Sequence, residues 1–345
     1  MNFWKNKRVF VTGHTGFKGS WLSLWLSSIG AEVCGYALSP PSDPALFHIV
    51  GLTAEMEHHT GDIRDFERLL SAMRGFKPDI VLHMAAQPIV RDSYVIPRDT
   101  YEINVMGTVC VLDAVRQCDS VKAVLNVTTD KVYENLEVAR GYVEGDALGG
   151  YDPYSNSKAC SELVTAAYKT SFLNEKGVHA ATARAGNVIG GGDFAPDRLI
   201  PDCVRSVMAG RPIYIRNPHS VRPWQHVLEP LKAYLLLAEK LYTEGAAFAE
   251  SFNIGPSLAD CCEVGEVVTL FCEVWGGAAF ELAADSGPHE AGLLMLNCEK
   301  AHTRLGWSPR WAIRDAIENT VIWTRTYIDR GDVRSVMLSQ INEYN

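Results

Sequence analysis

Short strand-like runs alternate with helical patterns through the first half of the chain. The apolar run Arg8–Thr12 is followed by a helical pattern over Lys18–Ile29 and by a second strand pattern at Glu32–Ala37. The later strands are expected at Asp79–His83, Val121–Val127 and Val178–Ala183, with helices at Tyr101–Cys118 and at about 153–173. This alternation predicts a doubly wound α/β fold, in which helices cover both faces of a parallel sheet.

The second half of the chain is less regular. Gly190-Gly191-Gly192 and prolines at 196, 201, 212, 218 and 223 interrupt a loop-rich stretch, which predicts a smaller, mixed α/β lobe over the carboxyl ends of the strands. We expect residues 1–183 to form the sheet domain and residues 184–220 and 257–345 to form the lobe. The segment 221–256, with a helix at Glu229–Leu241 and a strand at Ser251–Ile254, is expected to return to the sheet.

A glycine-rich loop joins the first strand to its helix. It reads Gly13-His14-Thr15-Gly16-Phe17-Lys18-Gly19, with the spacing G-x-x-G-x-x-G in place of the simplest fingerprint, G-x-G-x-x-G. Glycines allow a tight turn and let backbone amides approach a pyrophosphate, which the helix N-terminus also attracts. The loop therefore predicts a dinucleotide site in a Rossmann-type domain.

The residues after the second strand bear on the choice between NAD and NADP. The acidic residue that usually binds the ribose hydroxyls is absent, since Leu38-Ser39-Pro40 stands there. No Lys or Arg occurs between Gly19 and Ile63, so a ribose phosphate would meet little positive charge, and NAD is favoured; Lys18 is the one cation that complicates this choice. Asp62-Ile63 either meets the adenine or supplies a cap for a helix over 64–74.

Two groups of polar residues point to acid–base chemistry. Tyr154 and Lys158 share one face of a helix that Asp152-Pro153 is expected to open, so the ammonium can hold the phenol near a reacting hydroxyl. Thr129 adds a hydroxyl, as a simple dehydrogenase requires. Asp130 and Lys131 are additional acid–base groups, and they indicate hydride transfer coupled to an elimination.

Composition excludes several other classes of function. The chain has 345 residues, enough for a large core, and its net charge of −9 argues against nucleic acid or an anionic membrane as the main partner. The nine cysteines show no metal-ligand spacing, and we expect reduced thiols, no bound metal and a cytoplasmic location. We also expect no signal peptide and no membrane-spanning segment.

Further motifs carry a resemblance to a known family. His83-Met84-Ala85-Ala86-Gln87, Asn104-Val105-x-Gly107-Thr108 and Arg184-x-x-Asn187, with the glycine loop and the Tyr154/Lys158 pair, resemble the extended short-chain dehydrogenase/reductase family. Thr129-Asp130 followed by an acid or amine is similar to its nucleotide-sugar 4,6-dehydratases. Within this group, the chain most resembles the CDP-glucose 4,6-dehydratases. The residues that carry this resemblance are Lys131 and the runs at 149–158, 222–227 and 288–291.

The resemblance implies a role for each matching residue. It implies that NAD is held by the glycine loop, Asp62, Ile63, Ala85, Ala86, Gln87, Asn104, Tyr154 and Lys158, and that CDP-glucose is held by Asn187, Arg198, Arg222, Asn253 and Glu290. Each arginine could instead form a surface ion pair, and Glu290 could cap a turn. A homodimer or homotetramer is implied as well, although the same helix faces would suit burial against the smaller lobe.

The implied reaction begins with oxidation at carbon 4, during which Tyr154 takes the hydroxyl proton and Lys158 lowers the pKa of the phenol. Asp130 then acts as the acid for the departing 6-hydroxyl and Lys131 as the base at carbon 5. A lysine near its ordinary pKa of about 10.4 is mostly protonated, which is a difficulty for that base. An epimerase, a dehydratase for another nucleotide and a cofactor-sensing regulator are the alternatives, and the regulator would not need the full set of catalytic residues.

Overall fold

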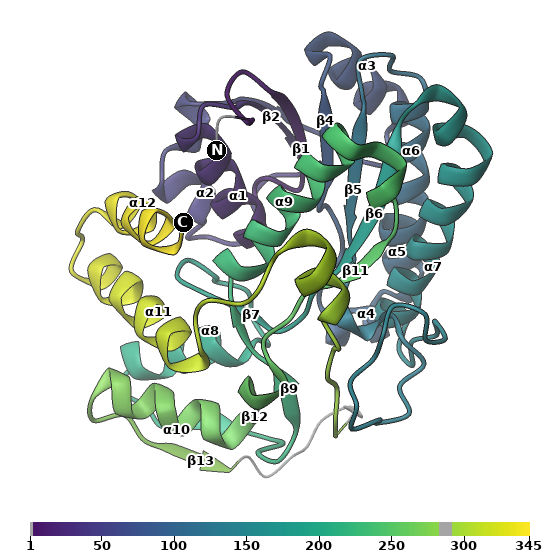
Figure 1. Ribbon diagram of the computed structural model, residues 1–345. Helices are drawn as coiled ribbons and strands as arrows, with labels where there is room; N and C mark the ends of the chain where they lie inside the picture. The colour runs from purple at the N-terminus through teal and green to yellow at the C-terminus, as the bar shows by residue number, and fades with distance from the viewer. Residues whose placement is uncertain (1–2, 283–291) are drawn as a thin grey trace.

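The computed structural model describes residues 3–282 and 292–345 (Figure 1). Its strands are β1 Arg8–Thr12, β2 Glu32–Ala37, β3 Glu57–Thr60, β4 Ile80–His83, β5 Ala123–Val127, β6 His179–Arg184, β7 Val188–Ile189, β8 Ile213–Ile215, β9 Val221–Pro223, β10 Gln225–His226, β11 Ser251–Asn253, β12 Cys261–Glu263 and β13 Phe280–Leu282. Its α-helices are α1 Phe17–Ser28, α2 Leu46–Ile49, α3 Phe66–Phe76, α4 Val90–Val95, α5 Pro97–Tyr101, α6 Gly107–Arg116, α7 Pro153–Tyr168, α8 Leu199–Met208, α9 Leu228–Glu244, α10 Val264–Trp275, α11 Ile313–Ile328 and α12 Val333–Tyr344. Single turns of π-helix extend α5 into α6 (Glu102–Met106) and lengthen α7 (Lys169–Leu173).

The large lobe is built on a seven-stranded parallel sheet in the order β11-β6-β5-β4-β1-β2-β3. Successive side chains of a strand point to opposite faces, and both faces are apolar here. Val9 and Val11 of β1 pack against α1 and α9, whereas Phe10 packs on the other face against α3 and α6. The predicted doubly wound Rossmann-type sheet is confirmed.

The smaller lobe has its own core beneath the carboxyl edge of the sheet (Figure 1). Helices α8 and α10 and the first part of α11 pack around three two-stranded ladders, of which β7–β10 and β8–β13 are parallel and β9–β12 is antiparallel. The predicted mixed α/β character is therefore present. In the part of the chain described by the structure, no helix combines the length and the apolar character that crossing a bilayer requires.

The division of the chain between the lobes differs from the expected one at two places. The return to the sheet domain begins with α9, because β9 pairs with β12 in the smaller lobe. Helix α12, expected in the smaller lobe, packs on α1 of the large lobe, where Tyr344 lies edge-to-face with Trp25 and donates a hydrogen bond to Glu229. An amphipathic pattern predicts that a helix is half-buried and leaves open which core it covers.

A buried ion pair joins α7 to the sheet. The Glu162 carboxylate accepts from Arg184 at 2.9 Å, and both side chains are 3% exposed. Glu162 also accepts from the hydroxyls of Thr128 at 2.5 Å and Thr182 at 2.6 Å. These partners lower the pKa of Glu162 in spite of its burial, so the pair is charged and fully hydrogen-bonded.

Arg184→Met should lower the free energy of unfolding by about 3–5 kcal/mol, because it leaves the Glu162 carboxylate buried without its cation. Urea denaturation measures this. The lowered pKa of Glu162 means that the contribution is present above its ordinary value of 4.5 and is lost as the pH falls through the lowered value. Arg314→Met is the control, because the exposed Arg314–Glu273 pair should contribute less than about 1 kcal/mol.

Candidate active site

The loops that leave the carboxyl ends of β1, β4, β5 and β6 meet at one edge of the sheet, where doubly wound folds bind their ligands. The loop after β5 carries Thr129, Asp130 and Lys131, and α7 brings Tyr154 and Lys158 beside it. Asp152 caps α7 by accepting from the Ser155 amide at 3.0 Å, and Pro153 occupies the first turn, as predicted.

Tyr154 is almost fully buried and hydrogen-bonds to the Thr129 side chain. Burial raises the pKa of its phenol to about 12, and the Thr129 hydrogen bond and the Arg198 charge only partly oppose this. The expectation that Lys158 lowers this pKa is not met in the ligand-free protein. The Lys158 ammonium instead donates to the Val127 carbonyl at 3.0 Å.

Lys158 is also buried, and desolvation lowers its pKa to about 8 although the neighbouring Glu162 carboxylate favours the charged form. The ammonium is therefore largely present at neutral pH and is lost as the pH rises above about 8. Glu162 lies four residues further along α7, on the same helix face.

Asp130 is the buried carboxylate of the site, with 0% of its surface exposed. Its Oδ1 accepts from the Thr129 hydroxyl at 2.9 Å and lies 3.9 Å from the Lys131 ammonium, whereas its Oδ2 has no hydrogen-bond partner among the described residues. The carboxylate fits against Gly186, where a Cβ atom would lie 2.1 Å from Oδ1. Lys131 is 31% exposed and lies at the rim.

The glycine loop has the shape that a dinucleotide needs. Gly13 has φ +77°, and a Cβ there would lie 2.8 Å from the Ala85 backbone nitrogen; a Cβ at Gly19 would lie 2.2 Å from the Gly13 carbonyl oxygen. At Gly16 a Cβ would meet protein only at 3.5 Å, so the space in front of it is left for a ligand. These residues fit a pyrophosphate approached by backbone amides at the start of α1.

The side chains between these glycines support the loop. The His14 ring is buried against Phe47 and His58, and burial lowers its pKa to about 4, so it is neutral. The Thr15 hydroxyl donates to the Leu38 carbonyl at 3.1 Å and ties the loop to the end of β2. Phe17, half-buried, opens α1.

The segment Ala85-Ala86-Gln87 leaves β4 beside the glycine loop, and the Ala85 amide donates to the Thr12 hydroxyl at 3.2 Å. Asn104 fixes this segment, because its side chain accepts from the Gln87 amide at 2.8 Å and donates to the Ser157 hydroxyl of α7 at 2.9 Å. Asn104 therefore joins the expected cofactor segment to helix α7.

Asp62 and Ile63 follow β3; the Asp62 side chain forms an ion pair, whereas the Ile63 side chain packs against α6. Asp62 pairs with Arg64 at 2.6 Å, which lowers the pKa of the carboxyl. The alternative that Asp62 caps the following helix is wrong, since Asp65 is the N-cap of α3 and accepts from the Arg68 amide at 3.3 Å. The Ile63 side chain packs where a Cβ on Gly107 would stand.

Of the expected substrate residues that the structure describes, Arg198 and Asn187 lie at the candidate active site, whereas Arg222 and Asn253 form hydrogen bonds with other protein groups. Arg198 pairs with Asp193 at 2.9 Å beside the catalytic residues, and the side-chain oxygen of Asn187 is buried without a hydrogen-bond partner in the described structure. Arg222 is buried and donates to the Val221 carbonyl. Asn253 makes its hydrogen bonds inside the protein, to Tyr133, Tyr142 and Asn297, so it braces the interior. Glu290 and the run 288–291 lie outside the described residues.

Several residues of this site were not expected from the sequence. Glu162 and Gly186 had local signals, namely the helix spacing from Lys158 and a glycine between two family positions. Tyr234 had none, since it lies in the apolar run of α9, yet its buried hydroxyl is near Tyr154 and Asp130. His226 is confirmed as a core residue, because its ring is fully buried beside Trp21 and Trp311.

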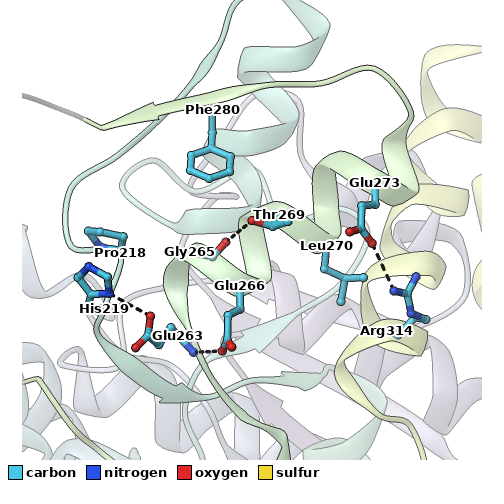
Figure 2. Close-up of a pocket in the computed structure, with 10 residues that line it drawn as sticks. All are labelled: Pro218, His219, Glu263, Gly265, Glu266, Thr269, Leu270, Glu273, Phe280 and Arg314. Carbon is cyan, nitrogen blue, oxygen red and sulfur yellow. Dashed lines mark hydrogen bonds and ion pairs between the residues drawn. The ribbon is translucent and has the colours of Figure 1, made fainter.

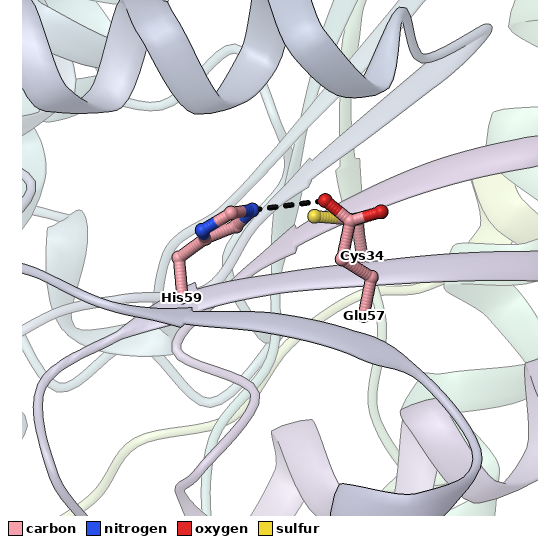
Figure 3. Close-up of side chains that lie close together, drawn as sticks. All are labelled: Cys34, Glu57 and His59. Carbon is pink, nitrogen blue, oxygen red and sulfur yellow. Dashed lines mark hydrogen bonds and ion pairs between the residues drawn. The ribbon is translucent and has the colours of Figure 1, made fainter.

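One trio of possible metal ligands lies away from this site, on β2 and β3 (Figure 3). The ligand atoms of Cys34, Glu57 and His59 lie within 4.8 Å of one another. His59 hydrogen-bonds to Glu57 at 3.0 Å, and burial raises the pKa of the Cys34 thiol to about 12. Because metals bind the thiolate, this trio is a weak candidate, and we assign no metal to it.

A hollow of about 460 Å³ lies on the smaller lobe between α10 and the loop around Pro218 (Figure 2). Its walls carry Glu263, Glu266 and Glu273, and Arg314 and His219 pair with two of these. None of the catalytic residues lines it. Its position and its carboxylates do not suit a diphosphate.

Comparison with known proteins gives consistent matches. The family described as GDP-mannose 4,6 dehydratase matches residues 10–320. A CDP-glucose 4,6-dehydratase from Salmonella typhimurium is 53% identical over 349 residues, which cover 99% of this chain and 97% of the relative. A UDP-glucose-4-epimerase structure from Stenotrophomonas maltophila with bound NAD has a TM-score of 0.83 at 22% identity, over 94% of this chain and 100% of that one. A dTDP-glucose 4,6-dehydratase structure from Streptomyces venezuelae with NAD has a TM-score of 0.79 at 27% identity, over 94% and 99%.

Two of the three glycines of the loop should separate an effect on folding from an effect on ligand binding. Gly19→Ala should lower the Tm of the ligand-free protein, because the new Cβ collides with the Gly13 carbonyl. Gly16→Ala should leave that Tm nearly unchanged and weaken NAD binding by about tenfold or more, because its Cβ enters the space left for the pyrophosphate. Thermal denaturation and calorimetric titration with NAD measure the two effects. Unchanged NAD affinity in Gly16→Ala would place the ligand elsewhere.

Proposed function

The chain belongs to the GDP-mannose 4,6-dehydratase family, and from that premise we propose that it converts CDP-glucose to CDP-4-keto-6-deoxyglucose and water, with NAD as its cofactor. It is a nucleotide-sugar 4,6-dehydratase of the extended short-chain dehydrogenase/reductase fold. One observation carries the proposal: a buried carboxylate, Asp130, stands beside the Thr129–Tyr154 pair, where a simple dehydrogenase or an epimerase has no use for an acid.

When bound, NAD supplies the hydride acceptor for carbon 4 and the hydride donor for carbon 6, so that the net reaction is a dehydration. The glycine loop would hold its pyrophosphate, and Lys158 its nicotinamide ribose. The segment 85–87, fixed by Asn104, would line the same side of the cofactor. Leu38, in place of an acidic residue, leaves no carboxylate there to bind the adenosine ribose.

In the first half-reaction, Tyr154 takes the proton of the 4-hydroxyl and Thr129 hydrogen-bonds to it. The pKa of about 12 in the ligand-free protein is too high for this role at neutral pH. The Lys158 ammonium would therefore have to leave the Val127 carbonyl and turn to the phenol and the ribose when the ligands bind. Because the pKa of Lys158 is lowered to about 8, we expect activity to decline above that pH.

In the second half-reaction, Asp130 acts in its protonated form: it donates that proton through Oδ2, its unpartnered oxygen, to the departing 6-hydroxyl and is left as the carboxylate, while Lys131 takes the carbon-5 proton. Lys131 lies 3.9 Å from Asp130. To act as the base it must enter this step as the neutral amine.

The substrate is tested by incubating the protein and NAD with CDP-, dTDP-, UDP- and GDP-glucose in parallel. Loss of about 18 mass units, one water, from CDP-glucose alone is the expected result. Turnover of another nucleotide sugar with a kcat/KM comparable to that for CDP-glucose would contradict the assignment of cytidine as the nucleotide. Appearance of an epimer without loss of mass would correct the reaction class.

Lys131→Met should still oxidise carbon 4 but should lose exchange of the carbon-5 proton with deuterated solvent, and kcat should fall by about 10²-fold or more. Asp130→Asn should keep that exchange but should no longer eliminate water. Stopped-flow absorbance of NADH and mass analysis in D₂O separate these steps. Full exchange in Lys131→Met would remove this lysine from the mechanism.

We also place the enzyme in the cytoplasm, where its nine free cysteines would stay reduced, with no nucleic-acid partner. A homodimer or homotetramer is supported by the face of α4, α5, α7 and the π-turn between α5 and α6, which exposes Tyr94, Val95, Ile96, Tyr101, Met106 and Leu163. Sedimentation velocity measures the oligomeric state, and a monomer at micromolar concentration would exclude both.

A further inference from the structure

Lys18 differs from its neighbours in the glycine loop because its side chain leaves the loop. It is the second residue of α1, and its ammonium lies 5.8 Å from the centre of the Tyr234 ring, on α9. Helix α9 crosses the sheet beside β5, the strand that leads to the catalytic residues. The Lys18 side chain is therefore directed from the cofactor loop into the reaction centre.

The groups that act on Lys18 all belong to that centre. Lys158 and Arg198 repel its charge, and Asp130 attracts it. The Tyr234 ring below it is fully buried, and the Tyr234 hydroxyl has no hydrogen-bond partner in the described structure. Tyr234 interacts electrostatically with Tyr154 and Asp130, so its hydroxyl borders the reaction centre.

Two cations and one carboxylate act on the charge of Lys18. Lys158 and Arg198 disfavour the charge of Lys18, and Asp130 is the carboxylate that favours it, whereas Lys158 has Glu162 and Arg198 has Asp193 as neighbouring carboxylates. Arg198 has Asp193 at 2.9 Å, whereas the contact that the structure gives the Lys18 ammonium is the Tyr234 ring, 5.8 Å from its centre. An unpaired cation in a poorly solvated place is costly, and a bound anion removes that cost.

We propose that Lys18 binds a diphosphate, together with Arg198, in the reaction centre. This inference rests on the proposed function, which supplies two diphosphates at this edge of the sheet, that of NAD and that of the nucleotide sugar. Both present the same chemistry, an anionic ester with oxygens that accept from an ammonium. Lys18 lies at the junction of the glycine loop with Arg198, which is expected to bind the sugar nucleotide.

The protonation of Lys18 gives the proposal a measurable signature. Burial and the two neighbouring cations lower its pKa to about 7 in the ligand-free protein. A diphosphate would favour the ammonium and raise this pKa, so binding at pH 8 should take up close to one proton per site, whereas binding at pH 6 should take up about none. Arginine at this position would stay charged and would take up none.

Calorimetric titration in two phosphate-free buffers of different ionisation enthalpy measures this uptake. In one arm, NAD is titrated into the ligand-free protein. In the other arm, CDP-glucose is titrated into the NADH-loaded protein, which cannot oxidise it. The arm in which the wild type takes up more protons at pH 8 than Lys18→Arg does identifies which diphosphate Lys18 binds.

Two variants test the assignment to Lys18. Lys18→Met should weaken that ligand by about tenfold or more and remove the share of the uptake that Lys18 contributes. Lys18→Arg should keep the affinity within about threefold and remove the same share, whereas any uptake by Lys158, whose pKa is about 8, should remain in both variants. Equal uptake in the wild type and a folded Lys18→Arg would overturn the proposal, as would an affinity loss in Lys18→Arg as large as that in Lys18→Met. A wild type that binds neither ligand would refute the proposed function itself, independently of Lys18.

Discussion

The buried ion pair between Glu162 and Arg184 is the interaction on which the geometry of the active site depends. It joins the catalytic helix α7 to strand β6, and the same carboxylate accepts from Thr128, the residue before Thr129. It also stands one helical turn from Lys158 and supports its charge. A charge pair of this kind is expensive to bury, and it is retained here with nearly every hydrogen-bonding position filled. The position of Tyr154 relative to Thr129 follows from it.

Burial, more than any single neighbour, determines the protonation states in the ligand-free protein. Desolvation raises the pKa of Tyr154 and lowers those of Lys158 and Lys18. All three shifts disfavour the charged forms that the proposed reaction needs. Anionic ligands would reverse the shifts of the two lysines, and the Lys158 ammonium, once turned to the phenol, would lower the pKa of Tyr154, so the catalytic charges are completed by binding. This links cofactor binding, substrate binding and the readiness of Tyr154 to accept a proton.

The sequence predicted the elements that have strong local signals. Apolar runs gave β1 and β2 with their correct bounds, and Asp152-Pro153 gave the start of α7, because a cap and a fixed φ act locally. The assignment of α12 failed because its pattern does not say which core it covers. The role of Asn253 and the direction of the Lys18 side chain could not be predicted from the sequence for a related reason. Both depend on contacts with residues of distant segments, Tyr133 for Asn253 and Tyr234 for Lys18. The family motifs predicted residues that the fold brings together at the candidate active site, but the protonation of Tyr154 required the three-dimensional environment.

The contact between Gly186 and the Asp130 carboxylate has a consequence for how such enzymes diverge. The carboxylate occupies the volume that any larger residue at 186 would need. Acquiring the carboxylate and keeping the glycine are therefore one evolutionary step that involves two loops, the one after β5 and the one after β6. A lineage that gave up water expulsion would lose the constraint on position 186 at the same time. The pair can thus serve as a two-residue marker when sequences of this fold are sorted by chemistry.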